Sequence, residues 1–424
     1  MDFDVIVIGG GLAGLSGAIR LAEHGLRCAV VSAGQGALFS SSGSLDLLSR
    51  LPDGTAVTSP PAALPALARM APRHPYSILG AETVATLAQE AQALLERCGL
   101  SLRGSMARNH LRITPLGTRR ATWLSPTDVP IVESGQNLPW HAILIAGIEG
   151  FLDFQPALVA DTLTREQGLD ARATLIHLPV LDSLRNNPSE FRAVNIARRL
   201  DIPDNAQAMT DELVRLAGDA ESIILPACIG LEDGRPLERL RAALGRPVHI
   251  LPTLPPSLLG VRFFQALRQR FNRLGGIFMP GDTVLKASMA GRRVMGLYTR
   301  NHGDIMLKAR QFILASGSFF SNGLLAEREG IREPVFNADI HSLPSRGDWC
   351  RTGFFEPQPY REFGVNTDDR LRLMAEREPM ENVYAAGAVL GGYDPLQQGC
   401  GAGVSLISAL SAARRILASA KEIA

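Results

Sequence analysis

Three glycines near the start of the chain have the spacing of a phosphate-binding loop. Gly9, Gly11 and Gly14 form a Gly-x-Gly-x-x-Gly pattern directly after a short apolar run. In this pattern the first glycine permits a tight turn, the second lets a pyrophosphate approach the backbone, and the third lets a helix pack close to a strand. A helix opening at Leu12 and Ala13 would point bare N–H groups and the positive end of its dipole at the phosphate. These residues therefore predict the binding of a nucleotide-type cofactor.

The segments around these glycines fit a β-α-β unit. Val5–Ile8 is apolar, as in a strand that is buried on both faces of a parallel sheet, and Cys28–Val31 is a second run of this kind. Between them, the apolar spacing predicts a helix from Leu12 to His24, which Gly25 terminates. Strand, glycines, helix and second strand in this order are specific, whereas a glycine pattern alone is weak evidence.

One part of the usual dinucleotide pattern is missing. Such sites place Asp or Glu after the second strand to hold the ribose hydroxyls, but here the position is Ser32. The loop that follows contains Ser41, Ser42, Gly43 and Ser44. These residues are expected to line the cofactor with backbone and hydroxyl donors, although a flexible surface loop would have the same composition.

Small residues near the carboxyl terminus form the rest of the expected cofactor site. They follow apolar runs or open the final helix: Ser316, Gly317, Gly387, Ala388, Gly401, Ala402 and Gly403. A glycine-rich helix start offers unpaired N–H groups to an electron-rich or anionic atom. We therefore expect the first and last parts of the chain to share one site.

Composition excludes several classes of function. Lys plus Arg number 43 and Asp plus Glu 42, and this net charge of +1 argues against a general nucleic-acid surface. The five cysteines lie far apart and form no C-x-x-C pair, so neither an iron–sulfur cluster nor any other metal site is expected. The acidic start lacks the basic segment of a signal peptide, and the uncharged runs are shorter than the ~20 residues of a spanning helix.

The chain is expected to form an α/β fold in two parts, because 424 residues exceed one ordinary core. From residue 142 onward, strand-like and helical stretches alternate, which is typical of a second parallel α/β layer. Ile277–Lys286 and Arg293–Thr299 are expected to be paired strands that turn at Gly291. We predict a Rossmann-type cofactor-binding domain with a parallel sheet (residues 1–50, 257–318 and 379–424). Residues 51–256 and 319–378 are predicted to form an inserted α/β substrate or cap domain.

These blocks together resemble two-domain flavoprotein dehydrogenases. The closer resemblance is to the B subunits of bacterial anaerobic glycerol-3-phosphate dehydrogenases. The similar stretches span nearly the whole chain: His24–Cys28, Ser41–Leu48, Thr114–Thr118, Glu190–Arg198, Leu251–Ser257, Gly330–Pro334 and Gln398–Gly401. The inner ones are not general features of Rossmann folds.

The resemblance implies a flavin and leaves its identity open. The family is described as using FMN, which has no adenosine and would account for Ser32, whereas the glycine pattern fits FAD. Ala388 also departs from the wider flavoprotein pattern, in which an Asp often bonds the ribityl chain or the phosphate.

The resemblance further implies a reaction and a complex. The reaction is oxidation of sn-glycerol 3-phosphate to dihydroxyacetone phosphate, with electrons passed to quinone and then to fumarate or nitrate. In the complex, a sister FAD-containing catalytic subunit pairs with this chain. An iron–sulfur subunit tethers both to the cytoplasmic face of the inner membrane.

The candidate catalytic residues lie in an irregular segment before the final glycine-rich block. If this chain oxidises the substrate, C2 gives a hydride to the flavin while a base takes the hydroxyl proton. His341 is the candidate base, and Arg346 or Arg351 is the candidate clamp for the substrate phosphate. The alternative is an electron-relay or assembly subunit, which the missing acids at Ser32 and Ala388 favour. A nicotinamide dehydrogenase is disfavoured, because the sequence has one dinucleotide fingerprint and lacks a second.

Overall fold

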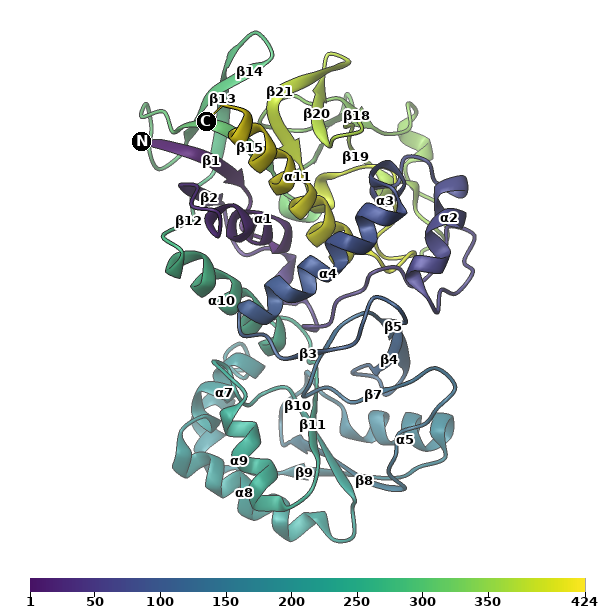
Figure 1. Ribbon diagram of the computed structural model, residues 1–424. Helices are drawn as coiled ribbons and strands as arrows, with labels where there is room; N and C mark the ends of the chain where they lie inside the picture. The colour runs from purple at the N-terminus through teal and green to yellow at the C-terminus, as the bar shows by residue number, and fades with distance from the viewer. Residues whose placement is uncertain (424) are drawn as a thin grey trace.

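A six-stranded sheet forms the centre of the first of two structural units (Figure 1). The computed structural model describes residues 1–423. In spatial order the strands are β12 (Ile277–Pro280), β2 (Cys28–Ser32), β1 (Asp2–Ile8), β15 (Lys308–Leu314), β21 (Glu378–Ala385) and β20 (Arg372–Ala375). All neighbours are parallel except β20 and β21. The predicted strands of the first β-α-β unit are confirmed, and their Val and Ile side chains are buried, as expected for a strand covered on both faces.

Four long helices belong to the first unit. They are α1 (Leu12–Ala22), α4 (Ala81–Arg97), α10 (Leu258–Arg273) and α11 (Gly401–Ile423). Helix α1 packs against both α10 and α11, and α4 packs against α11. Helix α1 ends two residues before the predicted His24, and Gly25 follows it with a φ of +81°. Within residues 1–423, none of the helices has the length and apolar character needed to cross a membrane.

The segment predicted as one strand at Ile277–Lys286 is divided in the structure. Residues 277–280 form β12 of the main sheet, and β13 (Val284–Ala290) pairs with β14 (Arg293–Thr299) in an antiparallel hairpin. Gly281 has a φ of +71° and separates the two strands. The prediction of a single strand was wrong because the chain turns at this glycine, where a left-handed conformation costs little. The predicted turn at Gly291 lies between β13 and β14.

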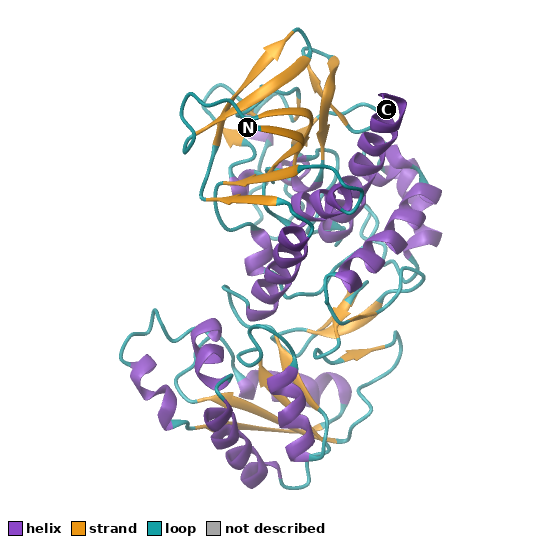
Figure 2. Cartoon of the chain, turned by 60° about the vertical axis from the view of Figure 1, so that its left-hand side comes forward, coloured by secondary structure: helices purple, strands orange, loops and turns teal. Residues whose placement is uncertain are grey.

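The second unit contains a four-stranded parallel sheet surrounded by helices (Figure 2). The strand order is β11 (Val248–Leu251), β10 (Ser222–Pro226), β8 (Ala142–Ile148) and β9 (Asp170–Ile176). The main helices are α5 (Pro156–Gln167), α7 (Ala193–Leu200), α8 (Pro203–Ala217) and α9 (Arg235–Leu244). The alternation predicted from residue 142 onward is confirmed, and the chain has the predicted α/β class.

Two hydrophobic cores divide the chain differently from the expected domain boundaries. The second core contains buried side chains from Ile113 to Val261 only. Buried side chains of 57–95 and of 324–373 lie in the first core, although residues 51–256 and 319–378 were expected to form one inserted domain. The difference arises because α4 packs on α11 and fills the first core with its apolar stripe. Helix α10 contributes Leu258 and Leu259 to the second core and Phe263 to the first.

The remaining elements are short. The helices are α2 (Pro60–Met70), α3 (Pro75–Leu79) and α6 (Asp182–Arg185). The strands are β3 (Leu102–Arg103), β4 (His110–Ile113), β5 (Arg119–Thr122), β6 (Ser125–Pro126), β7 (Ile131–Val132), β16 (Leu325–Ala326), β17 (Ile331–Arg332), β18 (Ile340–His341) and β19 (Gly364–Val365). The 3₁₀ turns are η1 (Ala37–Ser40), η2 (Pro179–Leu181), η3 (Phe319–Ser321), η4 (Arg346–Asp348), η5 (Pro359–Glu362) and η6 (Gly387–Val389).

Candidate functional site

The loop between β1 and α1 has glycines for two different physical reasons. Gly9 has a φ of +112°, and a Cβ there would overlap the carbonyl of Ala315 at the end of β15. A Cβ on Gly14 would overlap the carbonyl oxygen of Gly9, so this glycine allows α1 to start close to β1. Around Gly11, in contrast, no heavy atom lies within 4 Å of a Cβ position. Gly11 is the N-cap of α1 and provides no side-chain cap, which leaves open space beside unpaired helix N–H groups.

The carboxyl ends of three parallel strands meet at this loop. A Cβ on Gly9 would lie 3.1 Å from the Cα of Ser316, which follows β15 together with Gly317. Gly387 follows β21 with a φ of +78°, and its N–H donates to the Ser408 hydroxyl of α11 at 2.9 Å. The Oγ of Ser316 is buried and has no hydrogen-bond partner among the described residues. Strand ends that converge in this way are where open α/β folds bind ligands.

The serine-rich loop lies between α10 and the start of α11. The Ser41 hydroxyl accepts from the N–H of Gly43 at 3.3 Å, and that of Ser42 accepts from the N–H of Ser44 at 3.4 Å. The hydroxyls of Ser41 and Ser42 thus have hydrogen-bond partners within the loop itself. The third, the Oγ of Ser44, is buried without a partner among the described residues.

The two positions that depart from the flavoprotein pattern, Ser32 and Ala388, differ in exposure. The hydroxyl of Ser32 is buried and donates to the carbonyl of Gly34 at 3.0 Å, which leaves its oxygen as an acceptor. Ala388 is exposed beside Gly387. Any adenosine ribose at the end of β2 must therefore be held without a carboxylate from Ser32.

The start of α11 is held in place by a buried histidine. Gly401 and Ala402 are half-buried, Gly403 is buried, and the first turn of α11 has no acidic residue. Immediately before it, the Sγ of Cys400 lies 3.7 Å from Nε2 of His74. The N–H of Tyr76 donates to Nδ1 of His74 at 3.0 Å, so the neutral ring carries its proton on Nε2.

Burial keeps this pair neutral. It lowers the pKa of His74 to about 3 and raises the pKa of the Cys400 thiol well above its usual value. The contact therefore fixes the segment before α3 against the start of α11 without placing a charge there.

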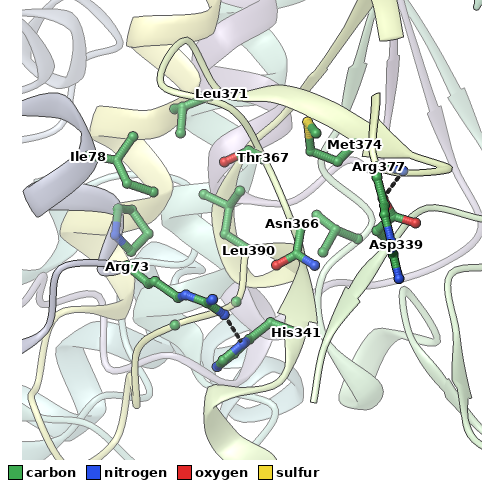
Figure 3. A pocket seen from close by; sticks show the side chains of 14 residues that line it. Arg73, Ile78, Asp339, His341, Asn366, Thr367, Leu371, Met374, Arg377 and Leu390 are labelled. Atoms are coloured by element: carbon green, nitrogen blue, oxygen red, sulfur yellow. Dashed lines mark hydrogen bonds between the residues drawn. The ribbon is translucent and has the colours of Figure 1, made fainter. Parts of the chain in front are cut away.

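A cavity of about 360 Å³ adjoins Leu390, which follows the turn η6 (Figure 3). Leu390, Gly391 and Gly392, which follow η6 directly, form part of its wall. Its charged and polar lining consists of Arg73, Asp339, His341, Asn366, Thr367 and Arg377. The cavity thus combines two guanidinium groups, one carboxylate, one imidazole and two neutral hydrogen-bonding side chains.

His341 and Arg73 contact each other in this cavity (Figure 3). Nη1 of Arg73 lies 3.1 Å from Nδ1 of the half-buried His341. Because a guanidinium can only donate, Nδ1 is the acceptor and the neutral imidazole carries its proton on Nε2. Burial and, second, the charge of Arg73 lower the pKa of His341. The ring is thus neutral at pH 7 and can accept a proton once Nδ1 is available.

Arg377 reaches the same cavity from the turn between β20 and β21. Glu376 and Arg377 both have positive φ, 53° and 64°, as a two-residue hairpin turn requires. The backbone N–H of Arg377 donates to the carboxylate of Asp339 at 2.7 Å, which ties the turn to the segment that leads into β18. A conformation that is unfavourable for Arg thus places its side chain in the wall of the cavity.

The structure does not bring the three candidate catalytic residues together. Arg346 donates to the carbonyl of Glu327 at 2.8 Å and lines a separate cavity of about 540 Å³. Arg351 lines a third cavity, of about 480 Å³, together with Glu362. His341 has Arg73 as its neighbour instead. No sequence pattern pointed to this pair, because Arg73 lies far from His341 in the chain and the Arg377 turn contains no glycine.

Comparison with known proteins gives the family of the chain. Residues 4–404 match a family model described as the FAD binding domain. The B subunit of anaerobic glycerol-3-phosphate dehydrogenase from Yersinia enterocolitica is 61% identical over 100% of both chains. The chain belongs to this family of B subunits. Proteins of the same name from Pectobacterium carotovorum and Actinobacillus pleuropneumoniae are 54% and 45% identical over 98% of this chain and 99% of their own.

The family match supports FAD as the cofactor, of the two flavins that the sequence left open. The site fits such a group, because there is open space at Gly11 and the buried hydroxyls of Ser316 and Ser44 have no protein partner among the described residues. The chain therefore belongs to a family of flavin-dependent dehydrogenases. In residues 1–423, no group of three or more His, Cys, Asp or Glu side chains is arranged to hold a metal ion.

Proposed function

We propose that this chain oxidises sn-glycerol 3-phosphate to dihydroxyacetone phosphate, with the substrate bound in the cavity of Arg73, His341 and Arg377. The observation that supports this most directly is the 3.1 Å contact between Arg73 and His341, beside the segment that continues from Gly387. A phosphate binder and a neutral imidazole side by side are what oxidation of a phosphorylated alcohol requires. The names of the similar proteins support the same substrate.

The side chains of the cavity divide into two tasks. Arg73 and Arg377 would bind the phosphate, since guanidinium groups match its oxygens with paired hydrogen bonds. His341 would take the proton of the C2 hydroxyl at Nδ1, and its lowered pKa keeps it unprotonated for this task. Asn366 and Thr367 could hold the remaining hydroxyl. When bound, FAD supplies the acceptor for the hydride that leaves C2.

The residues proposed to hold FAD are the ones that the structure brings to the strand ends. Gly11, Leu12 and Ala13 would face the pyrophosphate at the start of α1. The hydroxyls of Ser44 and Ser316 would bond the cofactor, which gives these buried groups a partner. The start of α11 would direct its N–H groups at the flavin.

We also propose that the chain works in a membrane-associated complex. The similar proteins are named as one subunit of a dehydrogenase, which supports the presence of other subunits. A sister FAD-containing catalytic subunit and an iron–sulfur subunit at the cytoplasmic face of the inner membrane would pass the electrons to quinone. Fumarate or nitrate would be the final acceptor.

A second candidate function is electron relay or assembly, with the substrate oxidised on the sister subunit. The observation that favours it is that no carboxylate stands at Ser32 or Ala388. A flavin that only relays electrons can be held by fewer side chains than one that also needs a precise orientation toward a substrate.

Anaerobic bleaching of the flavin separates the two candidates. We expect sn-glycerol 3-phosphate to bleach the flavin of the isolated FAD-loaded chain, and His341→Gln and Arg73→Gln each to slow bleaching at least tenfold. Arg346→Gln is the matched control, because Arg346 lines a different cavity. Absence of bleaching in the isolated chain, with normal turnover of complexes that contain either variant, would overturn substrate oxidation here and favour the second candidate, electron relay or assembly.

A further inference from the structure

The contact between Arg73 and His341 has a consequence for when His341 can act as a base. An imidazole has one lone pair for a proton, and in neutral His341 this lone pair lies on Nδ1 and points at the Arg73 guanidinium 3.1 Å away. A base whose lone pair accepts a hydrogen bond from a cation cannot accept a proton while that bond lasts. His341 therefore needs Arg73 to move before it can take part in the reaction.

The surroundings of His341 leave Arg73 as the group that can move. A Cβ on Gly391 would lie 2.9 Å from the Cβ of His341, so the segment after η6 closes against β18 on that side. The other charged groups lining the cavity are Asp339, on the segment leading into β18, and Arg377, in the β20–β21 turn. Arg73 has a long, exposed side chain, whereas its neighbour His74 is buried against Cys400. The backbone at this point is thus fixed while the guanidinium can swing.

We propose that the phosphate of the substrate draws the Arg73 guanidinium away from His341 and thereby makes Nδ1 available for the proton of the C2 hydroxyl. This inference rests on the function proposed above. A phosphate offers the guanidinium two oppositely charged acceptors in bidentate geometry, whereas the imidazole offers one neutral acceptor, so the phosphate competes effectively with the imidazole. The proton leaves the hydroxyl oxygen and is bound at Nδ1.

The arrangement would make proton acceptance by His341 depend on the phosphate of the substrate. A polyol without phosphate leaves Arg73 bonded to His341, so its hydroxyl meets no base even if it enters the cavity. Discrimination against unphosphorylated alcohols then comes from proton acceptance as well as from binding, and it should lower kcat in addition to raising KM. Arg73 is in this sense both a phosphate ligand and a positioning residue for His341.

Titration of His341 by NMR tests this without any turnover. The probe is inorganic phosphate added to the ¹⁵N-labelled full chain, with glycerol as the neutral control and the His341→Gln spectrum for assignment. We expect phosphate to raise the pKa of His341 by about one unit or more, because a cation leaves and an anion arrives, and we expect no change with glycerol. The ring nitrogen shifts should show Nδ1 losing its hydrogen bond.

Two variants distinguish the possible failures. Arg73→Gln should raise the pKa of His341 in phosphate-free protein and remove most of its response to phosphate. Arg377→Gln, the matched control, should weaken phosphate binding but leave the phosphate-free pKa of His341 unchanged, because Arg377 does not contact the ring. If ³¹P spectra show binding while the pKa of His341 stays constant, the release mechanism is wrong and the substrate site stands. If phosphate does not bind, the substrate site and the release mechanism both fall.

Discussion

Ala13, in the first turn of helix α1, lies directly against Gly387, in the turn that follows β21. A Cβ on Gly387 would lie 2.7 Å from the Cβ of Ala13, closer than two carbon atoms normally approach. The turn that follows β21 is therefore fixed against the first turn of α1, where the cofactor phosphates are expected. This contact determines how the two halves of the flavin site fit together.

Gly387→Ala should destabilise the protein by about 2–4 kcal/mol. The new Cβ would meet Ala13, and the positive φ of 78° is unfavourable for Ala. Gly25→Ala is the control, because Gly25 has a φ of +81° but no atom within 4 Å of its Cβ position. Urea unfolding measures both. Equal losses in the two variants would show that the contact with Ala13 contributes nothing.

Gly11→Ala should weaken FAD binding at least tenfold and leave the unfolding temperature of the cofactor-free protein nearly unchanged. Its Cβ would meet no protein atom, so it would occupy only space meant for the phosphates. Gly234→Ala, at the start of α9 in the second unit, adds a Cβ whose nearest neighbour is 3.9 Å away, and it should bind FAD as the wild type does. FAD titration followed by fluorescence compares them. Unchanged affinity of the Gly11 variant would exclude the phosphates from the start of α1.

Lowering the pH should destabilise the protein through His74. Its pKa is about 3 in the folded protein and near 6.5 when unfolded, so the unfolded state binds more protons below pH 6.5. Stability therefore falls as the pH drops through 6.5, by about 1.4 kcal/mol per pH unit, and this loss continues to about pH 3. His74→Asn should reduce the slope between pH 6.5 and 5 in urea unfolding, whereas the same change at exposed His24 should not. A slope that is the same in all three proteins would contradict a buried neutral His74.

Glycine substitutions at Glu376 and Arg377 should have different effects on substrate binding but similar effects on the stability of the protein. Replacing either residue by Gly removes an unfavourable left-handed conformation and should stabilise the protein by about 0.5–1 kcal/mol. Only Arg377→Gly should also weaken binding of sn-glycerol 3-phosphate, by tenfold or more, since Glu376 does not line the cavity. Calorimetry of both variants measures the two effects. Equal affinity in the two variants would remove Arg377 from the substrate site.

The sequence predicted those parts of the fold that depend only on residues close together in the chain. The apolar runs and glycine spacing around Gly9 and Gly14 determine a strand, a turn and a helix over a few residues, and these form as predicted. The break at Gly281 was missed because a glycine inside an alternating pattern does not by itself distinguish a bulge from the end of a strand. The two cores could not be located because α4 has an apolar stripe that could pack on either unit.

The substrate cavity depended on contacts that sequence spacing does not encode. His341, Arg346 and Arg351 are close in the chain, but short strands and turns direct them into three different cavities. Arg73 reaches His341 because His74 anchors its backbone against the start of α11. Closeness in the sequence thus did not predict which residues share a cavity. The partner of His341 is positioned instead by His74, a buried residue far from it in the chain.

The contact between Ala13 and Gly387 also bears on how the protein is made. The loop after β1 is translated long before Gly387 and α11. A nascent chain therefore cannot complete the cofactor site until α11 has left the ribosome, although its second unit could already be folded. Cofactor loading would then be a late event in biogenesis, because both halves of the site must be present before it.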